Sequence, residues 1–213
     1  MSAMSAETEA LRAALERARA AGFLGPGPVE PHLDHAVGFS EAVEAALGRE
    51  PANFADLGTG GGIPGLVLAL RWTGSRGVFI DSNQRRSGGL REAVLVLGLE
   101  GRIEVLEQRA EVVGRPGPYR EHFEVVTARS FGGPAVTAEI AAGLVTVGGV
   151  LVVSEPPDPA ARRWPPDQLA ELGFDPAETV EYARAHFAVV RKSARAPEGF
   201  PRPVGRPAKR PLW

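Results

Sequence analysis

The feature that most constrains this chain is the glycine-rich run Asp56-Leu57-Gly58-Thr59-Gly60-Gly61-Gly62-Ile63-Pro64-Gly65. Apolar residues stand on both sides of it, which predicts a buried strand, a tight loop and then a helix. Glycine has no Cβ, so it tolerates positive φ and lets the backbone come close to a ligand. Proline suits the first turn of the helix. The run therefore predicts a ligand site over glycine backbone where the helix begins.

The same residues match two patterns that favour different ligands. Gly60-x-Gly62-x-x-Gly65 has the spacing of the dinucleotide fingerprint. Asp56-x-Gly58-x-Gly60-x-Gly62 instead places a carboxylate at the end of the strand. A carboxylate repels a pyrophosphate and attracts a cation, so this second pattern favours S-adenosylmethionine over NAD. A tight turn without a ligand is the third interpretation, but the run holds more glycine than a turn needs.

Short apolar segments alternate with helical ones along most of the chain. Strands are expected at residues 53–56, 77–81, 102–106, 123–127, 148–153, 179–183 and 187–192. Helices are expected at residues 6–21, 32–47, 64–72, 84–97, 134–144 and 166–172. This alternation predicts an α/β fold of the Rossmann-like type, with a doubly wound, mostly parallel seven-stranded sheet and two N-terminal helices beside it.

Three regions follow from this pattern. Residues 1–50 form an N-terminal helical cap, residues 51–192 the ligand-binding sheet domain, and residues 193–213 a basic, proline-rich tail. Seven basic residues and one acid lie between Arg191 and Trp213, a local balance of +6 that leaves −8 on residues 1–190. A basic tail on an acidic body suggests a polyanionic partner. The tail could contact phosphates, and its five prolines would keep it extended. The alternative is a solvated tail that its charge keeps soluble.

Candidate ligand-binding residues follow several of the expected strands. Ligands of parallel sheets bind at the carboxyl ends of the strands. Asp81 ends the second strand, where a carboxylate accepts both hydroxyls of a ribose, although Asp81 also suits a helix N-cap. The residues expected together at this edge are Gly58, Asp81, Ala110, Glu111 and Arg129.

Composition excludes several kinds of protein. The chain has no cysteine, so disulfides and thiolate metal sites are excluded. Its four histidines show no metal-ligand pattern beyond His32-x-x-His35, which is interpreted as a pair of surface or packing residues, and no metal is expected. No run of eighteen apolar residues is present, and the N-terminus lacks the apolar stretch of a secretory signal. A cytoplasmic protein that does not insert into membranes is expected.

Several of these motifs resemble a known family, the bacterial 16S ribosomal RNA guanine-N7 methyltransferases, once called glucose-inhibited division protein B. The resemblance is carried by Asp56–Gly65, Asp81-Ser82, Arg109-Ala110-Glu111, Val126–Ser130 and Phe200-Pro201-Arg202 with Gly205-x-Pro207-x-Lys209. It implies that the sheet domain is a class I methyltransferase domain that binds S-adenosylmethionine through the glycine-rich run, including Asp56 and Gly60. It further implies that Gly58 and Ile63 line the methionine end, that Ala110 and Glu111 hold the adenine, and that Arg129 lies near the methyl donor and the RNA.

The implied reaction is methyl transfer to guanine N7 of small-subunit ribosomal RNA. N7 carries a lone pair and no proton, so the reaction needs alignment and electrostatics rather than a general base. Arg129 is the candidate catalytic residue, through the guanine O6/N7 edge or a phosphate. A salt bridge from Arg129 to Glu111 or Glu155 is its alternative role. Phe131 could stack on the base or belong to the core.

Other functions stay open because the chain departs from that family where RNA would be bound. The family's N-terminal motif with Asn-Leu-Thr is missing, Ser154-Glu155-Pro156 replaces a lysine-glycine pair, and Gly88-Gly89 replaces a bulky residue. The alternatives are a small-molecule methyltransferase, a non-catalytic RNA-binding paralogue and, more distantly, an NAD-dependent oxidoreductase.

Overall fold

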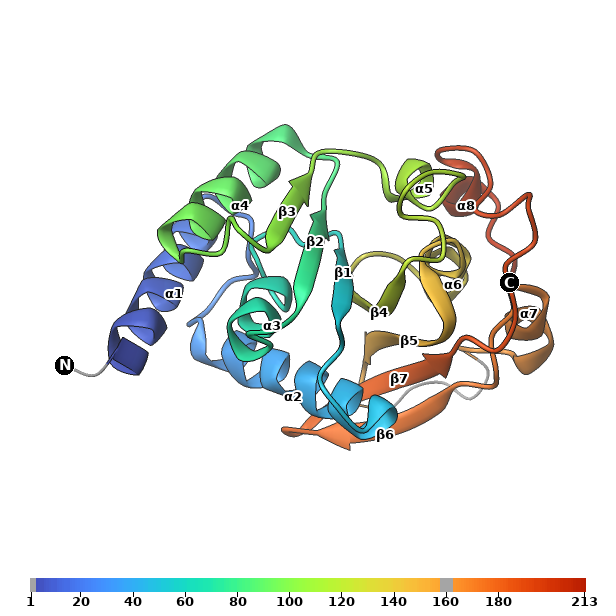
Figure 1. The fold of residues 1–213 in the computed structure, drawn as a ribbon, viewed down its shortest axis with the longest axis horizontal. Coiled ribbons are helices and arrows are strands. Elements are labelled where there is room, and N and C mark those ends of the chain that lie inside the picture. Colours follow the sequence, from blue (N-terminus) through green and yellow to red (C-terminus); the bar gives the residue numbers. More distant parts are fainter. Residues whose placement is uncertain (1–2, 158–162) are drawn as a thin grey trace.

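The computed structural model describes residues 3–157 and 163–213 and shows one seven-stranded sheet between two layers of helices (Figure 1). The strands are β1 (Asn53–Leu57), β2 (Arg76–Ile80), β3 (Ile103–Leu106), β4 (Phe123–Ala128), β5 (Val145–Glu155), β6 (Glu178–Tyr182) and β7 (Ala185–Arg191). Their order is β3-β2-β1-β4-β5-β7-β6, and β7 runs antiparallel to both of its neighbours. The predicted α/β sheet is confirmed.

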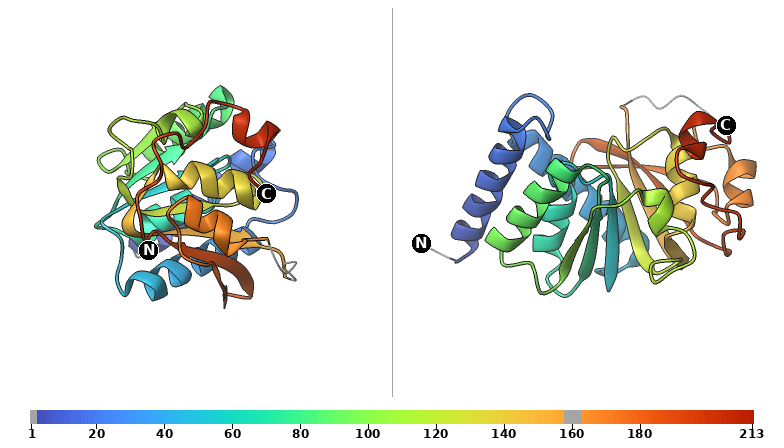
Figure 2. Two further views of the ribbon diagram at one scale, coloured as in Figure 1. Left: turned by 90° about the vertical axis from the view of Figure 1, so that its right-hand side faces the viewer. Right: turned by 90° about the horizontal axis from the view of Figure 1, so that it is seen from above.

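The helices cover the two faces of the sheet in chain order. They are α1 (Ala3–Ala20), α2 (Glu30–Leu47), α3 (Gly65–Arg71), α4 (Gln84–Val96), α5 (Ala110–Val113), α6 (Pro134–Ala142), α7 (Pro166–Glu171) and α8 (Arg206–Lys209). Apolar residues of α1 to α4 share one core cluster, and those of α5 to α7 share the other. Figure 2 shows α1 alongside α4 at one end of the molecule and α8 at the opposite end.

Strand β1 shows why the sequence folds with both faces of its sheet covered. Phe54 is fully buried in the first cluster, where its ring centroid lies 5.2 Å from that of Trp72. Ala55 and Leu57 are equally buried in the second cluster. Consecutive side chains of a strand point to opposite faces, so a continuous apolar run fits a parallel strand buried on both sides.

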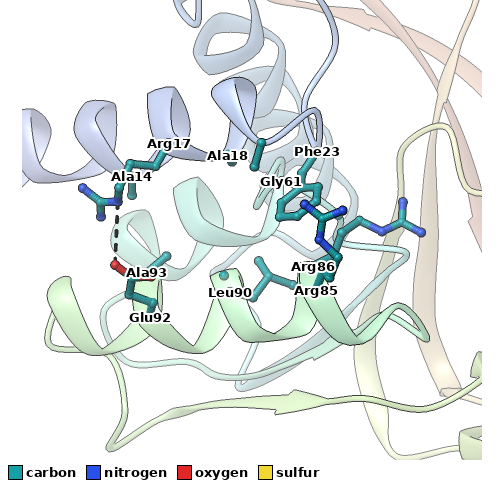
Figure 3. Close-up of a pocket in the computed structure, with 13 residues that line it drawn as sticks. Ala14, Arg17, Ala18, Phe23, Gly61, Arg85, Arg86, Leu90, Glu92 and Ala93 are labelled. Carbon is teal, nitrogen blue, oxygen red and sulfur yellow. Dashed lines mark ion pairs between the residues drawn. The ribbon is translucent and has the colours of Figure 1, made fainter.

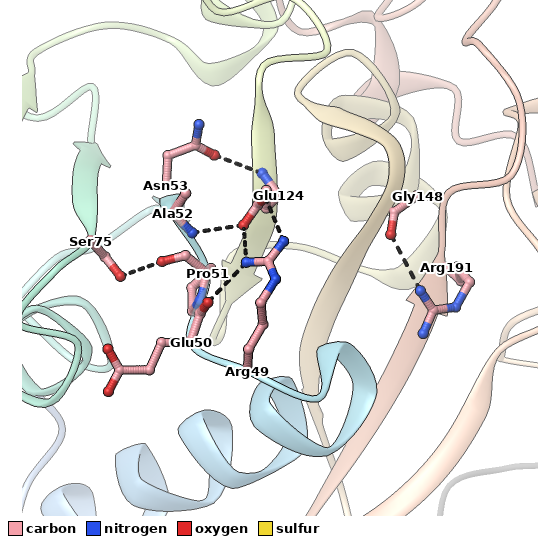
Figure 4. Close-up of polar contacts among 9 residues, drawn as sticks. All are labelled: Arg49, Glu50, Pro51, Ala52, Asn53, Ser75, Glu124, Gly148 and Arg191. Atoms are coloured by element: carbon pink, nitrogen blue, oxygen red, sulfur yellow. Dashed lines mark hydrogen bonds and ion pairs between the residues drawn. The ribbon is translucent and has the colours of Figure 1, made fainter.

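A network around Glu124 fixes the amino end of β1 against β4 (Figure 4). Its carboxylate accepts hydrogen bonds from both terminal nitrogens of Arg49, at 2.8 and 2.9 Å, and from the N–H of Ala52 at 2.7 Å. The N–H of Glu124 donates to Oδ1 of Asn53 at 2.8 Å. These contacts set where β1 begins and therefore where the glycine-rich loop at its other end lies.

The C-terminal segment lies on the body of the protein. Arg202 pairs at 2.5 Å with Glu139, whose side chain is fully buried. The N–H of Gly205 donates to Glu111 at 3.0 Å, and the indole N–H of Trp213 donates to the carbonyl of Arg163 at 2.9 Å. The expectation of an extended tail is wrong for residues 206–209, which form α8, because buried carboxylates hold the segment down. The division into three regions stays a prediction.

Candidate active site

The glycine-rich loop joins β1 to α3 at the carboxyl edge of the sheet. Gly58, Gly60 and Gly62 have φ of 64°, 57° and 102°, the left-handed region in which glycine is favoured. At Gly58 a Cβ would also lie 2.8 Å from the ring of Phe131, so this ring packs directly on the loop. The loop therefore needs glycine both for its conformation and for its contact with the segment after β4.

Asp56 lies beneath this loop and is fully buried. Oδ1 accepts a hydrogen bond from the Thr127 hydroxyl at 2.7 Å, and Oδ2 accepts one from the N–H of Gly65 at 3.2 Å. Burial raises the pKa of Asp56 to about 7, although these hydrogen bonds act in the opposite direction. Asp56 thus joins β1, β4 and the start of α3, and it supports the loop from below. A direct contact between Asp56 and a cofactor stays a prediction.

A cavity of about 440 Å³ opens at the carboxyl edge of the sheet beside this loop. Segments that follow β1, β2, β3 and β4 line it together with Ala208 of α8. It brings together four of the sequence-predicted site residues, namely Gly58, Asp81, Ala110 and Glu111. Asp56, Gly60, Ile63 and Arg129 are not among its lining residues. Such a cavity at this edge is where doubly wound sheets bind their ligands.

Asp81 connects the cavity to the loop. Its side chain is almost fully buried; Oδ2 accepts from the N–H of Gly60 at 3.0 Å and Oδ1 from the N–H of Asn83 at 2.8 Å. The N-cap of α4 is Asn83, whose side chain accepts from the N–H of Arg86, so the N-cap alternative for Asp81 is wrong. A carboxylate in the cavity wall is suited to accept hydroxyl donors, as the ribose interpretation requires.

Glu111 fastens the C-terminal segment over the cavity. Its carboxylate accepts from Arg109 at 2.8 and 3.2 Å and from the N–H of Gly205. Burial alone would raise the pKa of Glu111, but these hydrogen bonds bring it below the ordinary value of a glutamate. Through this contact Glu111 places α8, and with it Ala208, at the wall. The predicted contact between Glu111 and an adenine stays a prediction.

Arg129 follows β4 and is half-buried. Neither of the salt bridges considered for it forms, since Glu111 pairs with Arg109, and Glu155 pairs with Arg163 at 2.6 Å. One terminal nitrogen of Arg129 instead lies 2.6 Å from Nδ1 of His32. A guanidinium has only donors, so Nδ1 accepts. Burial lowers the pKa of His32 and the charge of Arg129 lowers it further, which keeps this nitrogen free to accept.

Sequence reasoning missed His32 as a neighbour of Arg129. The two residues are 97 positions apart, and no local pattern joins helix α2 to the end of β4. His35, one turn further along α2, packs with its ring centroid 5.4 Å from those of Phe39 and Phe187, as the packing interpretation predicts. Within residues 3–157 and 163–213, no group of three metal-ligating side chains is found.

Known proteins similar to this chain point to one family. Residues 30–155 match the family described as rRNA small subunit methyltransferase G. The chain belongs to this family. A member from Rubrobacter xylanophilus is 31% identical over 95% of this chain and 80% of its own length. Another, from Roseiflexus castenholzii, is 33% identical over 82% of this chain and 77% of its own length; both are named ribosomal RNA small subunit methyltransferase G.

Solved structures agree on the fold of this family member. The O-methyltransferase from Bacillus cereus, solved in complex with SAH, has a TM-score of 0.60 at 16% identity, and the match covers 86% of this chain and 91% of that one. A putative O-methyltransferase from Klebsiella pneumoniae has a TM-score of 0.59 at 12% identity, over 87% of this chain and 90% of that one. At these identities the likeness shows the fold alone.

Proposed function

We propose that this chain transfers a methyl group from S-adenosylmethionine to N7 of a guanine in small-subunit ribosomal RNA. The observation that carries the proposal is the cavity at the carboxyl edge of the sheet, where Gly58, Asp81 and Ala110 meet in a member of this family. A cytoplasmic location belongs to this proposal, because ribosomal RNA is made and modified there in bacteria. Among the residues that the structure describes, no helix combines the length and apolar character that a membrane span requires.

The residues of the cavity fit S-adenosylmethionine. Gly58, which lines the cavity where the loop leaves β1, would face the methionine end. Asp81 would accept the ribose hydroxyls, and Ala110 would lie against the adenine at the start of α5. When bound, S-adenosylmethionine supplies an electrophilic methyl group on a sulfonium. Asp56 lies beneath the loop, and its ionised form would favour a cation there.

The protein's own contribution to the reaction is alignment. Guanine N7 has a lone pair and no proton to lose, so no general base is needed. Arg129, directed by His32, would donate to the O6/N7 edge of the guanine or to a phosphate. Phe131 lies in the cavity wall next to Gly58, where its ring can stack on a base. In these roles Arg129 and Phe131 would face the substrate.

The experiment is methylation with labelled S-adenosylmethionine, followed by mass spectrometry of the nucleosides. Small ribosomal subunits, total RNA and a small-molecule extract are tested side by side. We expect labelled 7-methylguanosine from the small subunit and no labelled small molecule. Arg129→Lys should lower the rate at least tenfold without changing the thermal unfolding midpoint. Label in the small-molecule fraction, or RNA binding without any turnover, would overturn the proposal.

A further inference from the structure

A second cavity, of about 280 Å³, lies between α1 and α4 on the other side of the glycine-rich loop (Figure 3). Gly60 and Gly61 of the loop form part of its wall, together with Phe23 from the segment that follows α1. Arg86 is the one residue that lines both this cavity and the cavity assigned to the cofactor. The two hollows are therefore neighbours, and the proposed cofactor site does not use the second one.

The second cavity is cationic although the body of the chain is acidic. Arg17, Arg85 and Arg86 line it, and Glu92 is the acid among the lining residues. Arg17 and Glu92 face each other across the hollow at 4.0 Å, with both side chains exposed (Figure 3). A pair of this kind is weak, so Arg17 is available to an anion. Residues 1–190 carry −8 overall, and positive charge gathered here points to a bound anion.

An aromatic platform accompanies these charges. The guanidinium of Arg85 lies over the ring of Phe23, 5.7 Å from its centroid. Rings and guanidinium planes are the surfaces on which proteins stack unpaired bases of RNA. Arg86 adds a third guanidinium, whose Nε forms an ion pair at 3.4 Å with Oδ2 of Asp81 at the boundary between the two cavities. The second cavity thus offers a stacking surface and cationic side chains in one place.

Gly89 keeps the cavity open. It lies inside α4, where glycine costs about 1 kcal/mol relative to alanine. Its φ is not positive, and a Cβ would meet nothing closer than the Phe23 ring at 3.7 Å, an ordinary contact. Neither backbone nor packing therefore requires glycine at this position. Because Gly89 lines the second cavity, a side chain at position 89 would occupy the cavity itself.

We propose that this cavity binds a nucleotide of the RNA substrate, with its base on the Arg85–Phe23 platform and its phosphate between Arg17 and Arg85. This deepens the proposed function and rests on it. RNA is favoured over a free nucleotide because Arg206, Lys209 and Arg210 are exposed at α8, on the far side of the cofactor cavity. Positive charge on both sides of that cavity suits a chain of phosphates that spans it.

A matched pair of glycine substitutions tests the proposal. Gly89→Gln places a side chain in the hollow, whereas Gly88→Gln, on the same helix, has open space around its Cβ and lies outside it. Both should stabilise α4 slightly. We expect Gly89→Gln to weaken binding of a transcribed small-subunit RNA about tenfold, the loss of one stacked base. Gly88→Gln should leave it unchanged, and neither should alter the affinity for S-adenosylmethionine.

The charges are tested by the salt dependence of RNA binding. Arg17→Gln and Arg85→Gln should each reduce the slope of log affinity against log salt by roughly 0.7 to 0.9, as expected for one lost phosphate contact. Arg76→Gln, an exposed arginine at the opposite edge of the sheet, is the control and should change nothing. Guanosine monophosphate is a second probe: tight binding in this cavity would show a free-nucleotide site and overturn the assignment to RNA.

Failure of this proposal differs from failure of the proposed function. If wild-type protein binds no small-subunit RNA and methylates none, the proposed function fails. If wild-type protein binds and methylates RNA but Gly89→Gln behaves as Gly88→Gln does, only the role of the second cavity is refuted.

Discussion

At the scale of single residues, the positions of the acids were predictable but their partners were not. The pattern Asp56-x-Gly58-x-Gly60-x-Gly62 indicated a carboxylate at the end of β1, and Asp56 is the last residue but one of that strand. Which groups surround that carboxylate depends on Thr127, 71 positions away, and on the path of the loop to Gly65. Likewise, the contact between Arg129 and His32 was not predictable from the sequence. Sequence spacing carries no information about contacts between segments this far apart.

The raised pKa of Asp56 predicts that the stability of the protein depends on pH, and that the substitution Asp56→Asn removes this dependence. Its pKa is about 7 in the folded protein, against 3.8 for an ordinary aspartate. Between these values the folded state holds a proton that the unfolded state has lost, so this contribution is complete below pH 4 and disappears as pH rises towards 7. Asp56→Asn should therefore gain about 2–3 kcal/mol relative to wild type between pH 5 and 8.

Urea unfolding of both proteins at pH 5, 6, 7 and 8 measures this difference. His35, whose pKa falls to about 4 through burial, changes stability in the opposite direction over the same range. It is present in both proteins and cancels in the comparison. A difference between the two proteins that stays constant from pH 5 to 8 would show that Asp56 is charged throughout.

At the scale of elements, most helices and strands were predictable within a few residues, but the two four-residue helices were missed. Helices α5 and α8 span four residues each, too few to show helical periodicity. Strand β5 runs from Val145 to Glu155, beyond the expected 148–153, because its sequence includes Gly148-Gly149, which suggests a turn. The conformation of the C-terminal segment was not predictable because it depends on Glu139 and Glu111, buried in distant elements.

The ion pair between Arg202 and Glu139 should decide whether the C-terminal segment stays in place. Removing one partner of a buried pair leaves the other charge without compensation, at a cost of roughly 3 kcal/mol. Arg202→Ala should therefore destabilise the protein by about that amount and weaken binding of S-adenosylmethionine, since Ala208 lines its cavity. Urea unfolding and calorimetry measure the two effects.

The control for this pair is Lys209→Ala, which removes an exposed charge from the same segment. It should change neither stability nor affinity for the methyl donor. The double variant Arg202→Ala/Glu139→Ala should recover part of the lost stability, because no unpaired carboxylate remains buried. Equal effects of Arg202→Ala and Lys209→Ala would mean that net charge, rather than the pair, holds the segment.

At the scale of the whole molecule, the sheet topology was predictable because alternation of strands and helices leaves few arrangements. Parallel strands need crossover helices, and these pack on both faces of the sheet. The cavity between α1 and α4 was not predictable. It exists because residues 14–23 and 85–93 come together, and no local pattern of the sequence joins these two segments.

The Glu124 network should support the whole sheet in a pH-dependent manner. The hydrogen bonds from Arg49 lower the pKa of Glu124, so its contribution is present above the ordinary glutamate pKa and is lost as pH falls. Glu124→Gln should lower the urea midpoint at pH 7, and the difference from wild type should shrink below pH 4. Because Arg49 is solvent-exposed, added salt should also reduce the difference in urea midpoint between Glu124→Gln and wild type. A loss of stability in Glu124→Gln that is the same at pH 3.5 and pH 7 would contradict this prediction.

Arg86 has a consequence for the order of binding events. Its side chain forms part of both hollows and touches the acid that anchors the loop between them. A molecule that binds in one cavity and moves this guanidinium changes the shape of the other cavity. Thermodynamic reciprocity then requires that methyl donor and RNA alter each other's affinity by one common factor. Through this single shared arginine, the affinity for each of the two substrates would depend on whether the other is bound.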